Sequence, residues 1–157
     1  SPPKRERADM KAMTEPLAAE ARALSGARHQ VEVECDGPDV MGSLEELRSA
    51  FANLASNAVR YSPGGGTIRL SWTRGPDDLR FAVTDCGIGI EPIHISRLTE
   101  RFYRVDKSRS RETQGTGLGL AIVKHVLLRH SGRLVITSVP GQGSTFTAVL
   151  PNTSLPG

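Results

Sequence analysis

Apolar positions near the start of the chain predict an amphipathic helix followed by a strand. The helix covers residues 8–24, where apolar side chains recur at steps of three and four and Gly26 ends the run. Residues 29–35, HQVEVEC, alternate apolar and polar side chains as a half-buried strand does. The helix positions that we expect to face the core are Met10, Met13, Leu17, Ala21 and Leu24.

A short extended piece at residues 39–41 precedes a second amphipathic helix, predicted to run to about residue 60. Ser43 and Glu46 stand in front of its apolar run in the spacing of a capping box. The apolar stripe of this helix consists of Leu44, Leu47, Phe51, Leu54 and Ala58.

A polar row borders that stripe. Asn53, Asn57 and Arg60 follow one another at steps of four and three, so they share one face of the helix. Asparagine is a mediocre helix former, because its amide competes for backbone hydrogen bonds. The row therefore indicates a binding function, and a solvated polar edge is the alternative interpretation.

The rest of the chain predicts four strands and two further helices. The helices are expected over residues 91–100 and 118–129, and the second is apolar around much of its circumference, so most of it should be buried. The predicted strands cover residues 67–73, 79–84, 133–139 and 144–150.

One carboxylate stands directly after a predicted strand. Asp85 opens the stretch DCGIGI, and Gly87 and Gly89 follow it at alternate positions. A carboxylate at a strand end can accept a hydrogen bond from a ligand that lies against bare backbone. A simple Asp-containing turn is the alternative.

The stretch 101–124 combines aromatic, basic and glycine residues in front of an apolar helix. Its glycines stand at alternate positions, so the backbone amides there can approach a ligand closely. The N-terminus of the following helix favours anions, phosphates above all. A flexible surface loop that runs into a core helix is the alternative. The residues that carry this pattern are Phe102, Tyr103, Arg104, Lys107, Arg109, Arg111, Gly115, Gly117 and Gly119.

Composition narrows the class of protein. The 157 residues suit one domain, and 38% hydrophobic with 24% charged residues describe a soluble globular chain. The net charge of +3 is mild and partly local, so we expect no nucleic-acid partner. Cys35 and Cys86 have neither metal-site nor disulfide-scaffold spacing. No apolar run approaches a membrane span, so a cytoplasmic fragment without direct membrane contact is expected.

Four sequence boxes occur in order along the chain: NLASNAVRY, DCGIGI, RFYRV and GTGLGLAIVK, with GQGSTFTAVLP closing it. Together they resemble the ATP-binding catalytic domain of sensor histidine kinases, within the superfamily of gyrase-type, Hsp90-type and MutL-type ATPases. The tract LTERFYRVDKSRSR is particularly similar to the phosphate-regulon branch of these kinases. The resemblance implies an α/β fold of the Bergerat type. That fold is a two-layer sandwich with a mixed, mostly antiparallel sheet, about three helices on one face and a mobile ATP lid.

The resemblance also implies a role for each matching residue. Asn57 would coordinate Mg²⁺ and Asp85 would accept from the adenine amine. Asn57, Arg60 and Arg104 would be catalytic, with Arg104 reaching the γ-phosphate of ATP. The remaining expected nucleotide contacts are Asn53, Tyr61, Gly87, Gly89, Ile90, Phe102, Tyr103, Gly115, Thr116, Gly117, Leu118, Gly119, Leu120, and Ser144 or its neighbour Thr145.

One departure from the family pattern bears on partners. These kinases phosphorylate a histidine in a motif resembling H-E-x-R-T-P, and none of the four histidines of this chain has those neighbours. The resemblance therefore implies a catalytic fragment. Its partners would be ATP, the dimerisation and phosphoacceptor helical domain of the same kinase, and a cognate response regulator. The full-length parent would be anchored in the inner membrane.

Domain boundaries and competing functions complete the sequence-based expectations. We expect a linker at residues 1–7, the ATP-binding domain at 8–151 and a disordered tail at 152–157. A gyrase- or Hsp90-type ATPase and a non-catalytic nucleotide-sensing module are the alternatives. Walker-type and dinucleotide-binding loops are excluded because their glycine spacings do not occur.

Overall fold

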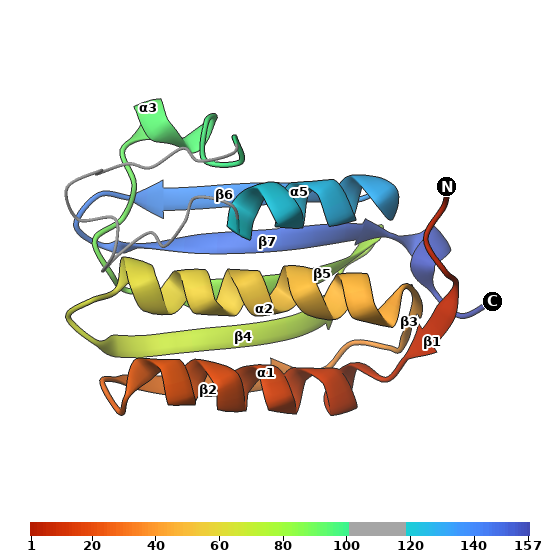
Figure 1. The fold of residues 1–157 in the computed structure, drawn as a ribbon, viewed down its shortest axis with the longest axis horizontal. Coiled ribbons are helices and arrows are strands. Elements are labelled where there is room, and N and C mark those ends of the chain that lie inside the picture. The colour runs from red at the N-terminus through yellow and green to blue at the C-terminus, as the bar shows by residue number, and fades with distance from the viewer. Residues whose placement is uncertain (101–118) are drawn as a thin grey trace.

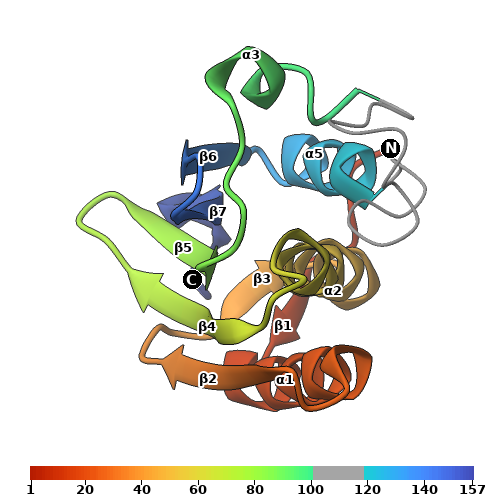
Figure 2. The ribbon, with the colours of Figure 1, turned by 90° about the vertical axis from the view of Figure 1, so that its left-hand side faces the viewer.

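The computed structural model describes residues 1–100 and 119–157, and it has the predicted two-layer α/β architecture (Figure 1). A five-stranded sheet has the order β2-β4-β5-β7-β6, in which β2 and β4 are parallel and all other neighbours antiparallel. Helices α1, α2 and α5 cover one face of this sheet (Figure 2). The elements are β1 (Glu6–Ala8), α1 (Met10–Ser25), β2 (His29–Cys35), β3 (Val40–Gly42), α2 (Leu44–Tyr61), β4 (Gly66–Arg74), β5 (Asp78–Asp85), α3 (Pro92–Ile95), α5 (Gly119–Arg129), β6 (Arg133–Val139), β7 (Gly143–Pro151) and the 3₁₀ helix η2 (Asn152–Ser154).

The core lies between the sheet and α2, the central helix of its layer. Phe51 of α2 stacks on Phe81 of β5 with ring centroids 4.3 Å apart, and Tyr61 stacks on Phe146 of β7 at 6.2 Å. Trp72 of β4 is fully buried beside them. These rings fix the position of α2 over the sheet from its middle to its C-terminal end, because interior packing leaves little free space.

The capping box of α2 is only half confirmed. The Ser43 hydroxyl accepts from the Glu46 backbone N–H at 3.2 Å, as a capping residue does. The Glu46 carboxylate, however, does not return to Ser43 and instead pairs with Arg129 of α5. The Ser43 N–H donates to Nε2 of His130 at 3.1 Å. Tertiary neighbours thus replace the local partner that the sequence pattern predicted.

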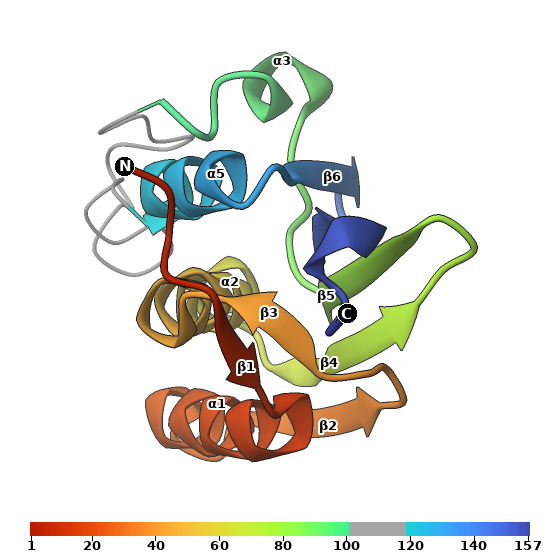
Figure 3. The ribbon, with the colours of Figure 1, turned by 90° about the vertical axis from the view of Figure 1, so that its right-hand side faces the viewer.

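The prediction that residues 1–7 lie outside the fold is wrong for Glu6 and Arg7. They belong to β1, which pairs antiparallel with β3 at the end of the sandwich where both termini lie (Figure 3). Arg5 donates to the carbonyl of Thr153 at 3.2 Å, so the C-terminal 3₁₀ helix is also held against the domain. Strand pairing satisfies backbone groups whatever the side chains, and the charged sequence did not reveal it.

Two predicted helices differ from the observed ones. Residues 91–100 form only the short helix α3 followed by turns. Helix α5 buries one face alone, since Ile122 is 42% and Leu128 63% exposed. Its apolar circumference was therefore a poor guide to burial, because α5 packs on α2 and the sheet from one side only. No described helix has the length and apolar character needed to cross a membrane.

Candidate functional site

Most of the predicted site residues that are described gather at one end of the sandwich. The C-terminal end of α2, the end of β5, the start of β7 and the N-terminus of α5 all lie there, on the left of Figure 1. Phe102, Tyr103, Arg104, Gly115, Thr116, Gly117 and Leu118 lie outside the described residues, so their expected roles stay predictions.

Asp85 is the last residue of β5 and is 4% exposed. Its Oδ1 accepts from the Gly87 N–H at 2.9 Å, whereas Oδ2 is buried with no partner among the described residues. Burial raises the pKa of this carboxyl, and hydrogen bonds from the backbone of Gly87 and Ser144 partly offset the rise. Buried polar atoms normally have a hydrogen-bond partner, so the unpaired Oδ2 indicates a position for a hydrogen-bond donor of a ligand.

The glycines after Asp85 have a structural reason that the sequence did not suggest. A Cβ on Gly87 would collide with the Tyr61 carbonyl, and one on Gly89, at φ +71°, with the Val139 carbonyl. The Ile88 N–H donates to that Tyr61 carbonyl at 3.1 Å. Close approach of protein backbone therefore requires these glycines, and ligand access through them stays a prediction. Ile90, the last residue of the box, is buried.

The choice between Ser144 and Thr145 follows from strand alternation. Ser144 pairs with Asp85 in the β5–β7 register, is 3% exposed, and bonds through Oγ to Ser138 Oγ at 2.7 Å. Thr145 bonds instead to Thr84 on the other face of the sheet, at 3.1 Å. Ser144 thus lies beside Asp85, and Thr145 lies away from it.

The polar row of α2 has unequal members. Asn53 donates to the Ser49 carbonyl at 2.8 Å and packs on α5 so closely that a Cβ on Gly119 would stand 2.9 Å from its Oδ1. Asn57 is 8% exposed, and its Nδ2 has no partner among the described residues. Arg60 is half-buried, contacts Ser56 Oγ at 3.4 Å, and forms no ion pair within residues 1–100 and 119–157.

The N-terminus of α5 meets this row. Gly119 begins the helix beside Asn53, and Leu120 is buried in its first turn. The helix has 11 residues, enough for its dipole to favour an anion at that end. Within the described ranges, no three His, Cys, Asp or Glu side chains form a metal-binding cluster.

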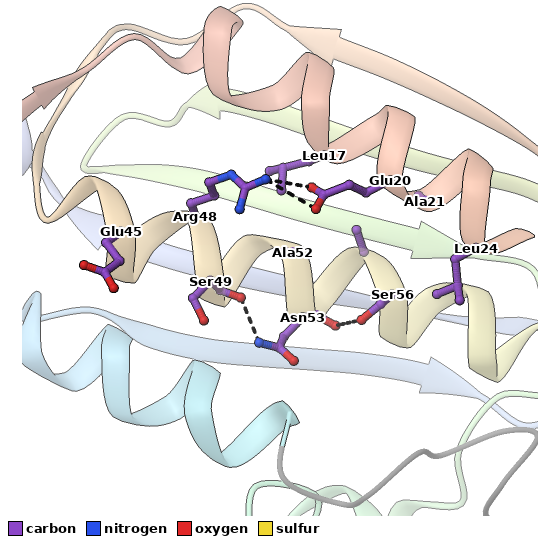
Figure 4. Close-up of a pocket in the computed structure, with 11 residues that line it drawn as sticks. Leu17, Glu20, Ala21, Leu24, Glu45, Arg48, Ser49, Ala52, Asn53 and Ser56 are labelled. Atoms are coloured by element: carbon purple, nitrogen blue, oxygen red, sulfur yellow. Dashed lines mark hydrogen bonds and ion pairs between the residues drawn. The ribbon is translucent and has the colours of Figure 1, made fainter.

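A groove of about 460 Å³ between α1 and α2 lies apart from these unsatisfied groups (Figure 4). Arg48 and Glu20 pair across it at 3.3 Å, and its lining includes neither Asn57 nor Asp85. Asn53 borders the groove but turns its amide toward α5. The groove is therefore not our candidate site despite its volume, because neither of the two unsatisfied side chains lines it.

Sequence reasoning missed a polar cluster beneath the site. His29 is buried and contacts the hydroxyls of Ser25 and Ser62. The only sequence feature that could have indicated this cluster is the position of Ser62 directly after the NLASNAVRY box.

Relatives with known names match most of this chain. It is 55% identical over 130 residues to the phosphate regulon sensor protein PhoR of Pseudomonas aeruginosa, covering 82% of this chain and 29% of that protein. It is 51% identical to the sensor-like histidine kinase SenX3 of Mycobacterium tuberculosis, covering 77% of this chain and 30% of the relative. The chain thus spans less than a third of the length of these relatives.

Solved structures agree with the fold. The mycobacterial sensor histidine kinase MprB superposes with a TM-score of 0.81 at 30% identity, covering 94% of this chain and 97% of that one. Full-length ShkA in complex with AMPPNP also reaches 0.81, at 24% identity and 31% coverage of its chain, which supports the fold alone. The sequence model of the histidine kinase-, DNA gyrase B- and HSP90-like ATPases matches residues 42–154, so the chain belongs to this family of ATP-binding domains.

Proposed function

We propose that this chain is the ATP-binding and phosphoryl-donor domain of a two-component sensor histidine kinase. The observation that supports this proposal is a pair of buried polar atoms without a hydrogen-bond partner, Asp85 Oδ2 and Asn57 Nδ2, near the same end of the domain. No other buried side-chain N or O atom in the described residues lacks a partner. A ligand with a donor at one end and anionic oxygens at the other would satisfy both atoms.

Adenine and the phosphates of ATP supply these two kinds of group. The exocyclic amine of adenine would donate to Asp85 Oδ2, beside Ser144. Phosphate oxygens would accept from Asn57 Nδ2 and Arg60 and would lie near the N-terminus of α5. This arrangement contributes by positioning and charge stabilisation, which supply most of the catalysis of phosphoryl transfer.

Mg²⁺ fits the same place through Asn57. Its carbonyl oxygen Oδ1 is the hard ligand that this ion takes, while Nδ2 remains available to donate to a phosphate oxygen. Mg²⁺ usually takes few protein ligands and completes its coordination with phosphate oxygens and water. When bound, it would neutralise charge on the phosphates, while Asn57 and Arg60 orient them.

The phosphoryl acceptor would be a histidine of a separate dimerisation helical domain, with a response regulator downstream. Both ring nitrogens of His29 and of His130 are engaged inside this domain, so neither presents a free nucleophile. The named relatives, PhoR and SenX3, favour a kinase over the gyrase-type or nucleotide-sensing alternatives, and the first favours a role in phosphate regulation. The domain would act at the cytoplasmic side of a kinase anchored in the inner membrane.

Two measurements test this proposal. Calorimetric titration with a non-hydrolysable ATP analogue should give binding that strengthens with Mg²⁺, whereas the matching GTP analogue should bind far more weakly. Addition of γ-labelled ATP and the helical domain of the same kinase should then give acid-labile, base-stable phosphohistidine. Binding without adenine preference would contradict the site, and binding without transfer would support the nucleotide-sensing alternative.

A further inference from the structure

His29 joins three elements beneath the site. It is the first residue of β2 and is 8% exposed. Its Nδ1 lies 2.8 Å from the hydroxyl of Ser25, the last residue of α1. Its Nε2 lies 2.6 Å from the carbonyl of Ser62, the residue that ends α2, and 3.0 Å from its hydroxyl. One imidazole therefore fixes the end of α2 to α1 and β2.

The partners assign the proton of this ring. The Ser62 carbonyl can only accept, so Nε2 carries a proton and donates it. The Ser62 hydroxyl donates to the Ala58 carbonyl at 2.6 Å and can also accept from Nε2. The Ser25 hydroxyl accepts from the His29 backbone N–H at 2.8 Å and donates to Nδ1. Every hydrogen bond of the cluster is then satisfied by a neutral ring.

The fixed end of α2 supports the loop that orients Asp85. Gly87 packs against the Tyr61 carbonyl and Ser62 so closely that no Cβ would fit. The N–H of Gly87 holds Asp85 Oδ1 at 2.9 Å, and this bond determines where the unspent Oδ2 points. A shift of Ser62 would therefore move Gly87 and rotate the carboxylate. The path from His29 to Asp85 runs through packed atoms at each step.

We propose that His29 is a positioning residue for base selection. It holds the end of α2 so that Gly87 aims the Asp85 carboxylate at the exocyclic amine of the nucleobase. This inference rests on the proposed function, because it presumes that Asp85 recognises adenine. It assigns His29 no contact with ATP. Asn57 and Arg60 belong to the same end of α2, so the phosphate end of the site should depend on His29 less than the base end does.

The test compares ligands with and without a base. His29→Leu removes both ring bonds, whereas His29→Gln retains a side-chain N–H donor that can reach the Ser62 carbonyl. Affinity for a non-hydrolysable ATP analogue and for inorganic tripolyphosphate is measured by competition against a fluorescent nucleotide, well below the melting temperature of each variant. His29→Leu should weaken ATP-analogue binding about tenfold and should weaken tripolyphosphate binding much less. His29→Gln should recover most of the loss.

An equal loss of affinity for the ATP analogue and for tripolyphosphate would overturn the inference, since a purely structural role lowers both affinities together. Unchanged affinity for the ATP analogue in a folded His29→Leu protein would overturn it as well. Ser25→Ala provides the second variant if His29→Leu does not fold. It removes the hydroxyl partner of Nδ1 and of the His29 backbone N–H but leaves both contacts of Nε2 with Ser62 in place, and it should weaken ATP-analogue binding about threefold relative to tripolyphosphate. An unchanged ratio there would equally overturn the inference. A wild-type protein without adenine preference would instead refute the proposed function itself.

Discussion

The two ends of α2 differ in how their polar groups are satisfied. At its N-terminus, Glu46 forms a two-pronged ion pair with Arg129 at 2.6 and 3.1 Å, and the Ser43 N–H bonds to His130. Toward its C-terminus, Asn57 of α2 and Asp85 at the end of β5 each keep a buried atom without a partner in the described residues. The first end is closed by the protein itself, and the second leaves bonding capacity for something else.

This difference separates stability from function. A buried donor or acceptor without a partner costs about 1–3 kcal/mol of folding free energy. Native proteins retain such groups where a ligand, ion or water completes them. Changes at the Asp85 end should therefore affect binding more than folding, and changes at the Glu46 end should do the opposite.

The largest effect is expected from Asp85→Asn. The variant turns an acceptor into a group that can present a donor to the adenine amine, so ATP-analogue affinity should fall about 5- to 150-fold in calorimetry. Its melting temperature should not fall, because burial already disfavours the ionised carboxylate, as its raised pKa indicates.

Asp77→Asn is the matched control, since Asp77 is exposed in the turn between β4 and β5, at the other end of the strand. It should bind ATP as the wild type does. A lower melting temperature in Asp85→Asn together with unchanged ATP-analogue affinity would contradict the division between the two ends of α2.

The next effect concerns the polar row. Asn57→Ala should lower ATP-analogue affinity about tenfold in the presence of Mg²⁺ and less in its absence, because it removes both the carbonyl oxygen proposed for the ion and the Nδ2 donor that has no protein partner in the described residues. Asn53→Ala should have a smaller effect, since the Asn53 amide already bonds to Ser49. Calorimetry with and without the metal measures both, and equal losses for the two variants would remove the distinction.

The sequence drew attention to the residues at one of these two ends and not to the bonds at the other. Asn57 and Asp85 stand in local boxes that resemble those of sensor histidine kinases, and this resemblance implies their roles. The bonds of the closed end join residues 83 and 87 positions apart, namely Glu46 with Arg129 and Ser43 with His130. No local pattern encodes such pairs, because they depend on how α5 packs against α2. The role of His29 was not predicted for the same reason, because its partner Ser62 is 33 residues away in the sequence.

A smaller effect, on stability, is expected at the closed end. Glu46→Gln removes a pair that is 27% exposed on both sides, and it should lower the melting temperature by about 2–4 °C while leaving ATP affinity within about twofold. Glu32→Gln is the control, because its ion pair with Arg69 is more than half exposed and such pairs contribute little. Equal melting temperatures of the two variants would show that the end of α2 is not held by Glu46.

The smallest effect is a difference in pH dependence between the two ends. The hydrogen bond from Arg129 lowers the pKa of Glu46 below its ordinary value of 4.5, so its contribution to stability is present above that pH and is lost as pH falls through the lowered pKa. Burial raises the pKa of Asp85 above 3.8, so the folded state takes up a proton first and the cost of the buried charge disappears as pH falls into that range. Thermal melts from pH 7.5 to 3.5 measure both pH dependences. Any stability advantage of Asp85→Asn over the wild type should shrink as pH falls through the raised pKa of Asp85, whereas the lower stability of Glu46→Gln relative to the wild type should persist to lower pH. Parallel curves for the two variants would mean that the ends of α2 do not differ in the way that their hydrogen bonds indicate.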